Sequence, residues 1–184
     1  MISDQGNFTT HFNKMLKLFC PDMYVLSVTD IDTDRLKERG FCYMMIDLDN
    51  TLLPWGEDSF PDEVIEWLEK SSVRGFKICI VSNASRKRVQ FLAEKLNLPF
   101  ICYAGKPLKG CFFKALDLMN GNVESSVVIG DQIFTDIFGG NRTGIFTILV
   151  RPVKIRELFT TRIMRKFEKM AIYLLKRKRF FPEL

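Results

Sequence analysis

Four acidic side chains of this sequence lie in two short motifs that could carry chemistry. Asp47 and Asp49 are two residues apart in I-D-L-D-N-T-L-L, and Asp131 and Asp136 lie in G-D-Q-I-F-T-D. Side chains at positions i and i+2 of an extended chain point to the same side, so the first pair of carboxylates would converge. Converging carboxylates are unfavourable unless a cation or a shared proton compensates. The pattern therefore indicates a site that holds one or the other.

Ser82 and Lys106 would add a hydroxyl and an ammonium group to these carboxylates. Oxygen ligands with no His or Cys nearby suit Mg²⁺. A lysine and a hydroxyl beside a divalent cation suit a phosphoryl group, whose oxygens need neutralising donors. These residue types favour phosphoryl transfer with Mg²⁺ as cofactor. The alternative for each acid is a structural role, because Asp-rich turns after strands often act only as caps and turn formers.

The segments that must position these groups alternate between strand and helix patterns. Apolar runs without helical spacing predict strands at 41–48, 77–82, 100–103, 126–130 and 145–150. Helical spacing and end signals predict helices at 61–72, 85–96 and 108–119. Strands that are apolar almost throughout are typical of a parallel sheet covered on both faces. The sequence therefore predicts an α/β fold with a doubly wound, Rossmann-like parallel sheet.

In such a sheet the ligand site lies beyond the carboxyl ends of the strands. Each candidate group follows one of the predicted strands directly or within a few residues. In chain order these residues are Asp47 and Asp49, Ser82 and Asn83, Lys106, and Asp131 and Asp136. All of them are therefore expected at one edge of the sheet.

In these motifs the sequence resembles the haloacid dehalogenase (HAD) superfamily. D-L-D-N-T resembles its first motif, Ser82 the second, Lys106 the third and G-D-Q-I-F-T-D the fourth, in the right order. The resemblance covers roughly residues 40–150. It implies a phosphatase that works through an aspartyl-phosphate, with Asp47 as nucleophile and Asp49 as general acid/base.

The same resemblance implies roles for the remaining candidates. Ser82 and Lys106 would hold the phosphoryl oxygens, and Thr51 and Asn83 would help to shape the loop that binds the substrate. Mg²⁺ would be held by Asp47, by the backbone carbonyl of Asp49 and by Asp131, with Asp136 in support.

Composition limits the rest of the chain. The 184 residues are 47% apolar, which is typical of one globular domain with short extensions. The five cysteines are dispersed and odd in number, which disfavours a zinc site or a disulfide framework and favours a reducing compartment. No secretory signal or membrane-spanning run is expected. We expect an N-terminal helical extension at 1–39, the catalytic domain at 40–150 and a basic amphipathic helix at 151–184.

That C-terminal segment holds eleven Lys or Arg residues against three acidic ones. Its apolar side chains recur at spacings of three and four: Ile155, Phe159, Ile163, Phe167, Met170 and Leu174. Basic side chains on another face, Arg162, Arg165, Lys169 and Lys176, would suit an anionic membrane interface. A shorter candidate is H-F-N-K-M-L-K-L-F-C-P near the start. Alternatively, both helices pack on the domain. A basic tail also attracts nucleic acid, but the sequence disfavours nucleic acid as a partner.

No predicted interval leaves room for a cap domain over the site, and an open site suits a phosphate carried by a large or membrane-bound substrate. The closer resemblance is to YqeG-type members of HAD subclass IIIA, similar to phosphatidylglycerophosphate phosphatases. It implies dephosphorylation of phosphatidylglycerophosphate to phosphatidylglycerol. Together with the basic C-terminal helix, this leads us to expect a cytoplasmic protein peripherally associated with the inner face of the membrane. The alternatives are a phosphatase for a soluble or macromolecular phosphoester and a non-enzymatic RNA- or ribosome-associated module. The intact acidic set argues against the module.

Overall fold

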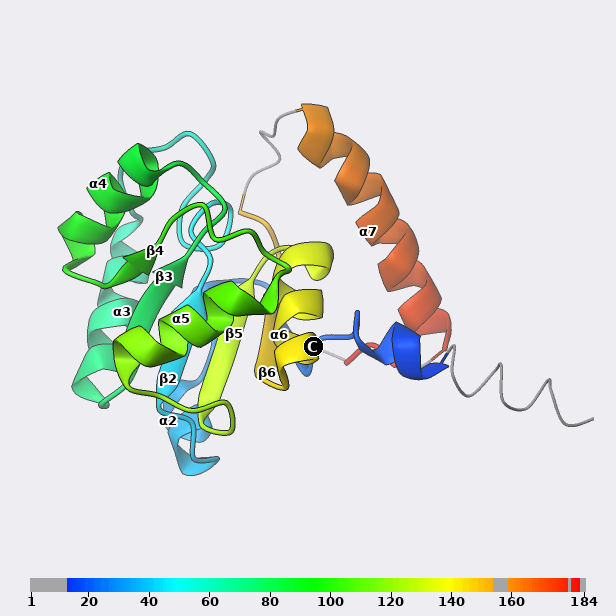
Figure 1. Ribbon diagram of the computed structural model, residues 1–184, viewed down its shortest axis with the longest axis horizontal. Helices are drawn as coiled ribbons and strands as arrows, with labels where there is room; N and C mark the ends of the chain where they lie inside the picture. Colours follow the sequence, from blue (N-terminus) through cyan, green and yellow to red (C-terminus); the bar gives the residue numbers. More distant parts are fainter. Residues whose placement is uncertain (1–12, 154–158, 179, 183–184) are drawn as a thin grey trace, which may run out of the picture.

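The computed structural model describes residues 13–153, 159–178 and 180–182, without the side chains of 159–166. In this part of the chain, six parallel strands form one sheet (Figure 1). They are β1 (Met23–Val25), β2 (Tyr43–Ile46), β3 (Lys77–Val81), β4 (Phe100–Ile101), β5 (Ser126–Gly130) and β6 (Phe146–Val150). Their order is β1-β6-β5-β2-β3-β4. All five predicted strands are therefore present, although the strand predicted at 100–103 covers only Phe100–Ile101 and the one at 41–48 only Tyr43–Ile46. The doubly wound parallel fold is confirmed.

Strand β1 was not predicted from the sequence. It pairs in parallel with β6, with Met23 opposite Ile148 and Val25 opposite Val150. All three of its residues are only half-buried, so it lacks the continuous apolar run of the central strands. In the described part of 1–39, residues 13–17 and Thr33–Glu38 are helical, as expected, whereas β1 belongs to the sheet. The boundaries at residues 40 and 150 stay a prediction.

The three predicted helices are also confirmed, as α3 (Asp62–Val73), α4 (Arg86–Leu96) and α5 (Lys109–Met119). Asn97 and Asn120 end α4 and α5 in the left-handed conformation, as C-terminal residues of helices often do. Other helical elements are η1 (Val28–Asp30), α2 (Thr33–Glu38), α6 (Phe138–Thr143), α7 (Phe159–Arg177) and the π-helical turn η2 (Ile133–Ile137).

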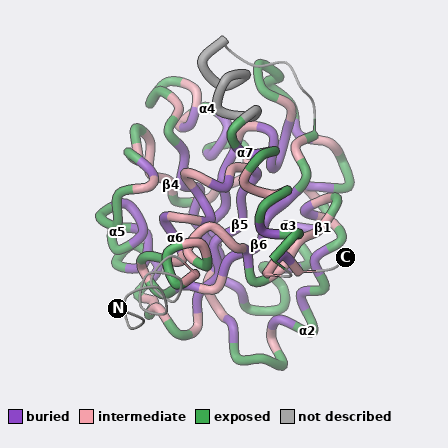
Figure 2. Tube along the Cα trace, turned by 90° about the vertical axis from the view of Figure 1, so that its right-hand side faces the viewer, coloured by how far each residue is buried: buried purple, intermediate pink, exposed green. Residues whose placement is uncertain are grey.

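Helices cover both faces of the sheet. Successive strand residues point to opposite faces, and the central strands are apolar on both, so each face needs a covering layer. Met44 and Ile46 of β2 pack in a core with α2, α3 and α4, whereas Met45 faces a second core against α5. The strands form the buried centre of the molecule, and exposed residues lie mainly on the peripheral helices and loops (Figure 2). This arrangement fixes the central strands, whose carboxyl ends carry the site.

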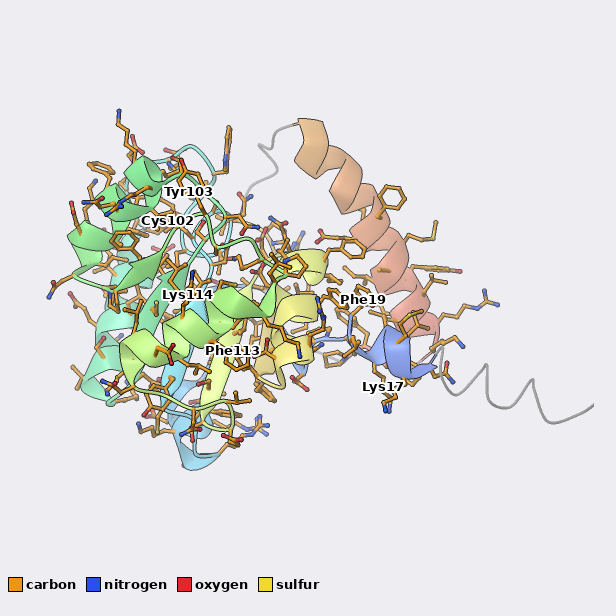
Figure 3. The ribbon with its side chains drawn as sticks, viewed as in Figure 1. Lys17, Phe19, Cys102, Tyr103, Phe113 and Lys114 are labelled. Carbon is orange, nitrogen blue, oxygen red and sulfur yellow. The ribbon has the colours of Figure 1, made fainter. Side chains whose placement is uncertain are left out.

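The two ends of the described chain pack on the outer side of η2 and α6. The Phe19 ring stacks on Phe138 with a centroid separation of 4.5 Å (Figure 3). From α7, Leu175 is fully buried in a cluster with Ile133 and Ile137. Buried Glu168 of α7 accepts a hydrogen bond of 2.8 Å from the Ile133 backbone N–H. One face of α7 therefore belongs to the fold.

The opposite face of α7 is exposed. Phe167, Met170 and Tyr173 are 59–61% exposed, beside exposed Lys169 and Lys176. The predicted apolar stripe is thus solvent-facing from Phe167 onward; Ile155 and the side chains of Phe159 and Ile163 lie outside the described residues. None of the described helices combines the length and apolarity that crossing a bilayer requires.

Candidate active site

A pocket of about 160 Å³ lies at the carboxyl edge of the sheet. It is lined by Asp47, Asp49, Asn50, Trp55, Ser82, Asn83, Ala84, Lys106, Gln132 and Thr135. These residues follow β2, β3, β4 and β5, the strands that we expected to carry the site. The structure therefore brings most of the sequence-predicted residues to one place.

Asp47 directly follows β2, and its backbone N–H donates to the Ile129 carbonyl of β5. Its carboxylate is buried and accepts a hydrogen bond of 2.6 Å from the Lys106 ammonium group. Burial raises the pKa of Asp47 to about 7, although Lys106 lowers it, and the nearby Asp136 and Asp49 raise it further. The ionised form of Asp47 is therefore less favourable, relative to the protonated form, than in an ordinary aspartate unless a cation in addition to Lys106 is present.

Lys106 binds two acids at once, since its ammonium group also donates to Asp136 Oδ1 at 2.6 Å. Burial lowers the pKa of Lys106, but Asp136 and Asp47 more than offset this effect and raise it above its usual value. Lys106 therefore stays protonated at physiological pH and can donate to an anionic oxygen.

The carboxylates of Asp47, Asp131 and Asp136 form a buried cluster in which one oxygen of each lies within 4.8 Å of the others. Gly130 makes this approach possible, because a Cβ at this position would overlap the carboxylate of Asp136. Three converging hard oxygen ligands fit Mg²⁺ better than a soft metal. The residues present thus match the ion that the sequence predicts.

Asp49 points elsewhere: its Oδ1 accepts hydrogen bonds from Nε and Nη2 of Arg88, at 2.9 and 2.6 Å. The side chain of Asp49 is thus paired with α4 rather than with the acidic cluster. Arg88 was not predicted as a site residue, because nothing in the sequence distinguishes it from the neighbouring Arg86 and Lys87.

Ser82 is buried at the end of β3, and its hydroxyl accepts a hydrogen bond from the Ala84 N–H at 3.2 Å. Asn83 binds the main chain of Lys106 twice, accepting from its N–H at 2.9 Å and donating to its carbonyl at 3.2 Å. Asn83 therefore holds the backbone of Lys106 in place. The Thr51 hydroxyl is buried, has no hydrogen-bond partner in the described part of the chain and does not line the pocket.

The pocket is in contact with solvent, and Trp55 in its lining is 40% exposed. Between β2 and β3 the chain forms a loop and α3, and between β3 and β4 it forms α4 alone. Neither interval contains an inserted domain that would close over the site (Figure 1).

A parallel α/β sheet with acids after β2 and β5 and a lysine after β4 defines the HAD type of phosphatase. Residues 103–155 match the family model Hydrolase_like, described as HAD-hydrolase-like. Over 162 residues the chain is 43% identical to the "Probable phosphatase YqeG" of Bacillus subtilis, covering 88% of this chain and 94% of that protein. The chain belongs to the YqeG family of HAD phosphatases.

More distant relatives carry a more specific description. The chain is 27% identical to "Phosphatidylglycerophosphate phosphatase 1" of Arabidopsis thaliana, over 85% of this chain and 47% of that protein. It is 27% identical to the enzyme of the same description from Chlamydomonas reinhardtii, over 91% of this chain and 66% of that protein.

Solved structures support the fold. The chain is similar to an uncharacterized protein from Listeria monocytogenes, with a TM-score of 0.52 and 19% identity over 64% of this chain and 85% of that chain. It is also similar to the cobalt-bound deoxy-D-mannose-octulosonate 8-phosphate phosphatase from Haemophilus influenzae, with a TM-score of 0.50 and 13% identity, over 74% of this chain and 90% of that chain.

Proposed function

We propose that the protein is a Mg²⁺-dependent phosphomonoesterase that works through an aspartyl-phosphate on Asp47. The observation that carries this proposal is a buried carboxylate in an open pocket, bonded to Lys106 and within 4.8 Å of two further acids. A nucleophile needs neighbouring positive charge to accept an anionic substrate, and Lys106 provides part of it.

In the first step, an oxygen of Asp47 attacks phosphorus and the bond from phosphorus to the ester oxygen breaks. The leaving oxygen takes a proton from Asp49. In the second step, Asp49 accepts a proton from a water molecule whose oxygen attacks the aspartyl-phosphate. The phosphorus–Asp47 bond breaks, inorganic phosphate is released and the Asp47 carboxylate is restored.

Ser82 and Lys106 would hold the phosphoryl oxygens in both steps, with Asn83 keeping the Lys106 backbone in place. Mg²⁺ would be held by Asp47, by the Asp49 carbonyl and by Asp131, with Asp136 in support. When bound, the ion would offset the negative charge on the transferring phosphoryl group.

The proposed substrate is phosphatidylglycerophosphate, and the product is phosphatidylglycerol. The similarity to the two plant and algal phosphatases supports this substrate. The pocket is also open, as the headgroup of a lipid in a membrane requires.

The exposed face of α7 supports action at a membrane surface. Its apolar side chains Phe167, Met170 and Tyr173 lie beside lysines, an arrangement that suits an anionic lipid interface. The proposed location is therefore peripheral, on the cytoplasmic face of a membrane.

The test is phosphate release from phosphatidylglycerophosphate in mixed micelles with Mg²⁺. Wild type should release phosphate, while Asp47→Asn or addition of EDTA should abolish release. The matched control is Asp117→Asn, which removes an exposed carboxylate from α5 and should retain activity. Turnover of a soluble phosphate ester that depends on Asp47, without turnover of the lipid, would refute the substrate and leave the chemistry intact.

Membrane association is tested separately by co-sedimentation with anionic liposomes. Phe167→Glu combined with Met170→Glu should lower the bound fraction, since both changes put negative charge on the exposed face of α7. Phe113→Glu is the control, because Phe113 of α5 is 45% exposed but lies on another helix (Figure 3). Equal binding by all three proteins would refute the role of α7.

A further inference from the structure

Arg88 is bonded to Asp49, a residue of the site, but the proposed chemistry gives Arg88 no role. Its side chain is 19% exposed, and two of its nitrogens bond to Asp49 Oδ1. It also donates to the Glu57 carbonyl at 3.1 Å and forms a long ion pair of 3.5 Å with the exposed Asp58 carboxylate. Arg88 therefore joins α4 to the loop that follows β2.

This pairing bears on the work of Asp49. As the proposed general acid/base, Asp49 must turn its carboxylate toward the leaving oxygen of the substrate. In the structure Oδ1 of this carboxylate is committed to two charge-assisted hydrogen bonds with Arg88, which are stronger than neutral ones. Releasing Asp49 would leave a mostly buried guanidinium group without its principal anionic partner, a costly change unless another anion replaces it.

A second hollow lies on the other side of Arg88. It measures about 390 Å³ and is lined by Asp58, Ser85, Lys87, Arg88 and Phe91. Asp49 lines the catalytic pocket, and Arg88 lines this hollow, so their ion pair lies between the two. The hollow offers positive charge from Arg88 and Lys87 and apolar surface from Phe91, which is 48% exposed. Asp58 is the one acid in this lining; its side chain is 75% exposed and pairs with Arg88 only at a long 3.5 Å, so it opposes an anion less than the two cations attract it. These groups suit an anion attached to an organic chain.

We propose that Arg88 is a specificity-determining residue that exchanges the Asp49 carboxylate for a second anionic group of the substrate, such as a phosphodiester, bound in this hollow. The exchange keeps the guanidinium paired and frees the Asp49 carboxylate to take a proton from solvent and face the leaving oxygen. Substrates without a second anion leave the Asp49–Arg88 pair closed and react slowly. This inference rests on the proposed phosphatase chemistry and narrows its substrates to phosphomonoesters that carry a further negative charge.

The test compares two soluble phosphomonoesters with Mg²⁺ present. One is glycerophosphoglycerol phosphate, which has a phosphodiester beside the reacting group, and the other is glycerol 3-phosphate, which lacks it. Wild type should prefer the first in kcat/KM by roughly tenfold to a hundredfold, the range for a hydrogen bond to a charged group. Arg88→Met should reduce this preference to less than about threefold by the same reasoning. Arg88→Lys should keep part of it, because the charge remains.

The control is Arg86→Met, which removes the same charge from an exposed position two residues away on α4 and should keep the preference. Binding is measured in parallel by calorimetry on Asp47→Asn and on Asp47→Asn/Arg88→Met, which requires no turnover. The second change should weaken binding of the diester-containing compound and leave binding of glycerol 3-phosphate much less affected.

The inference would be overturned if wild type showed no preference in kcat/KM and Asp47→Asn none in binding. It would also be overturned by a preference that survives Arg88→Met. These outcomes are separate from the fate of the proposed function. Lipid turnover with a preference unchanged by Arg88→Met would refute only the role of Arg88. A preference that depends on Arg88 without lipid turnover would refute only the lipid substrate.

Discussion

Replacing Lys106 by Met would remove the one positive charge bonded to both Asp47 and Asp136. The Lys106 side chain is 3% exposed, and its two acidic partners are 8% and 1% exposed. Without the ammonium group, two buried carboxylates would face each other with little solvent. Removing one partner from a buried ion pair typically costs about 3–5 kcal/mol. Each kcal/mol lowers the melting temperature of a chain of this size by about 2–4 °C, so we expect a fall of roughly 6–20 °C.

The assay is thermal unfolding followed by circular dichroism at pH 8 in EDTA. Lys114→Met is the matched control, because Lys114 is exposed on α5 and its loss should change the melting temperature little. The double variant Asp47→Asn/Lys106→Met should recover part of the lost stability, since one of the opposed charges is gone. Adding Mg²⁺ should narrow the gap between Lys106→Met and wild type. If the melting temperature of Lys106→Met in EDTA lay within about 2 °C of wild type, the reasoning would be refuted, because this shift is well below the expected fall of roughly 6–20 °C.

Three further predictions concern the same site. Gly130→Ala should destabilise the protein by about 1–3 kcal/mol and impair catalysis, because its Cβ would overlap the Asp136 carboxylate. Both glycine variants are compared with wild type by urea titration, in which Gly110→Ala in α5, with open space around it, should be neutral or stabilising. Because the pKa of Asp47 is raised to about 7 from 3.8, the stability that it contributes without metal is full below about pH 4. This contribution should be lost as the pH rises to about 7. The free energy of unfolding should therefore depend less on pH between about 4 and 7 in Asp47→Asn than in wild type. The same pH dependence in both proteins would contradict the prediction. Asn83→Ala should lower kcat about tenfold or more, the typical loss for a misplaced catalytic group, with little change in melting temperature. An unchanged kcat would show that the Lys106 backbone is held by other contacts.

The central fold and most of the site could be predicted from the sequence, because both depend on local patterns. Strands β2, β3 and β5 are buried on both faces and therefore appear as nearly continuous apolar runs. Polar residues at their carboxyl ends then share an edge by the geometry of a parallel sheet. β1 lacked this signal, since its three residues are half-buried at the edge of the sheet.

The partners of individual side chains could not be predicted, since they depend on contacts between distant segments. Arg88 lies 39 residues from Asp49, and its pairing follows from how α4 packs above the loop after β2. The sequence predicts Asn83 in the substrate-binding loop. Its hydrogen bonds to the Lys106 backbone depend on the pairing of β3 with β4, which the sequence does not show. The burial of Glu168 could not be predicted either, because the sequence around it is a basic helix with many charged residues; in the structure Glu168 is 3% exposed.

The hydrogen bond from Ile133 to Glu168 has a thermodynamic consequence. Ile133 lies between Asp131 and Asp136, so the loop that bears two of the clustered acids is anchored to the helix that bears the exposed apolar face. An ion bound by the acids and a surface bound by Phe167 and Met170 would act on one shared arrangement of loop and helix. If the ion and the membrane surface both favour that arrangement, binding of either one must raise the affinity for the other by the same factor, because coupling between two binding sites is reciprocal. Affinity for lipid measured in EDTA would then understate the affinity of the metal-loaded protein.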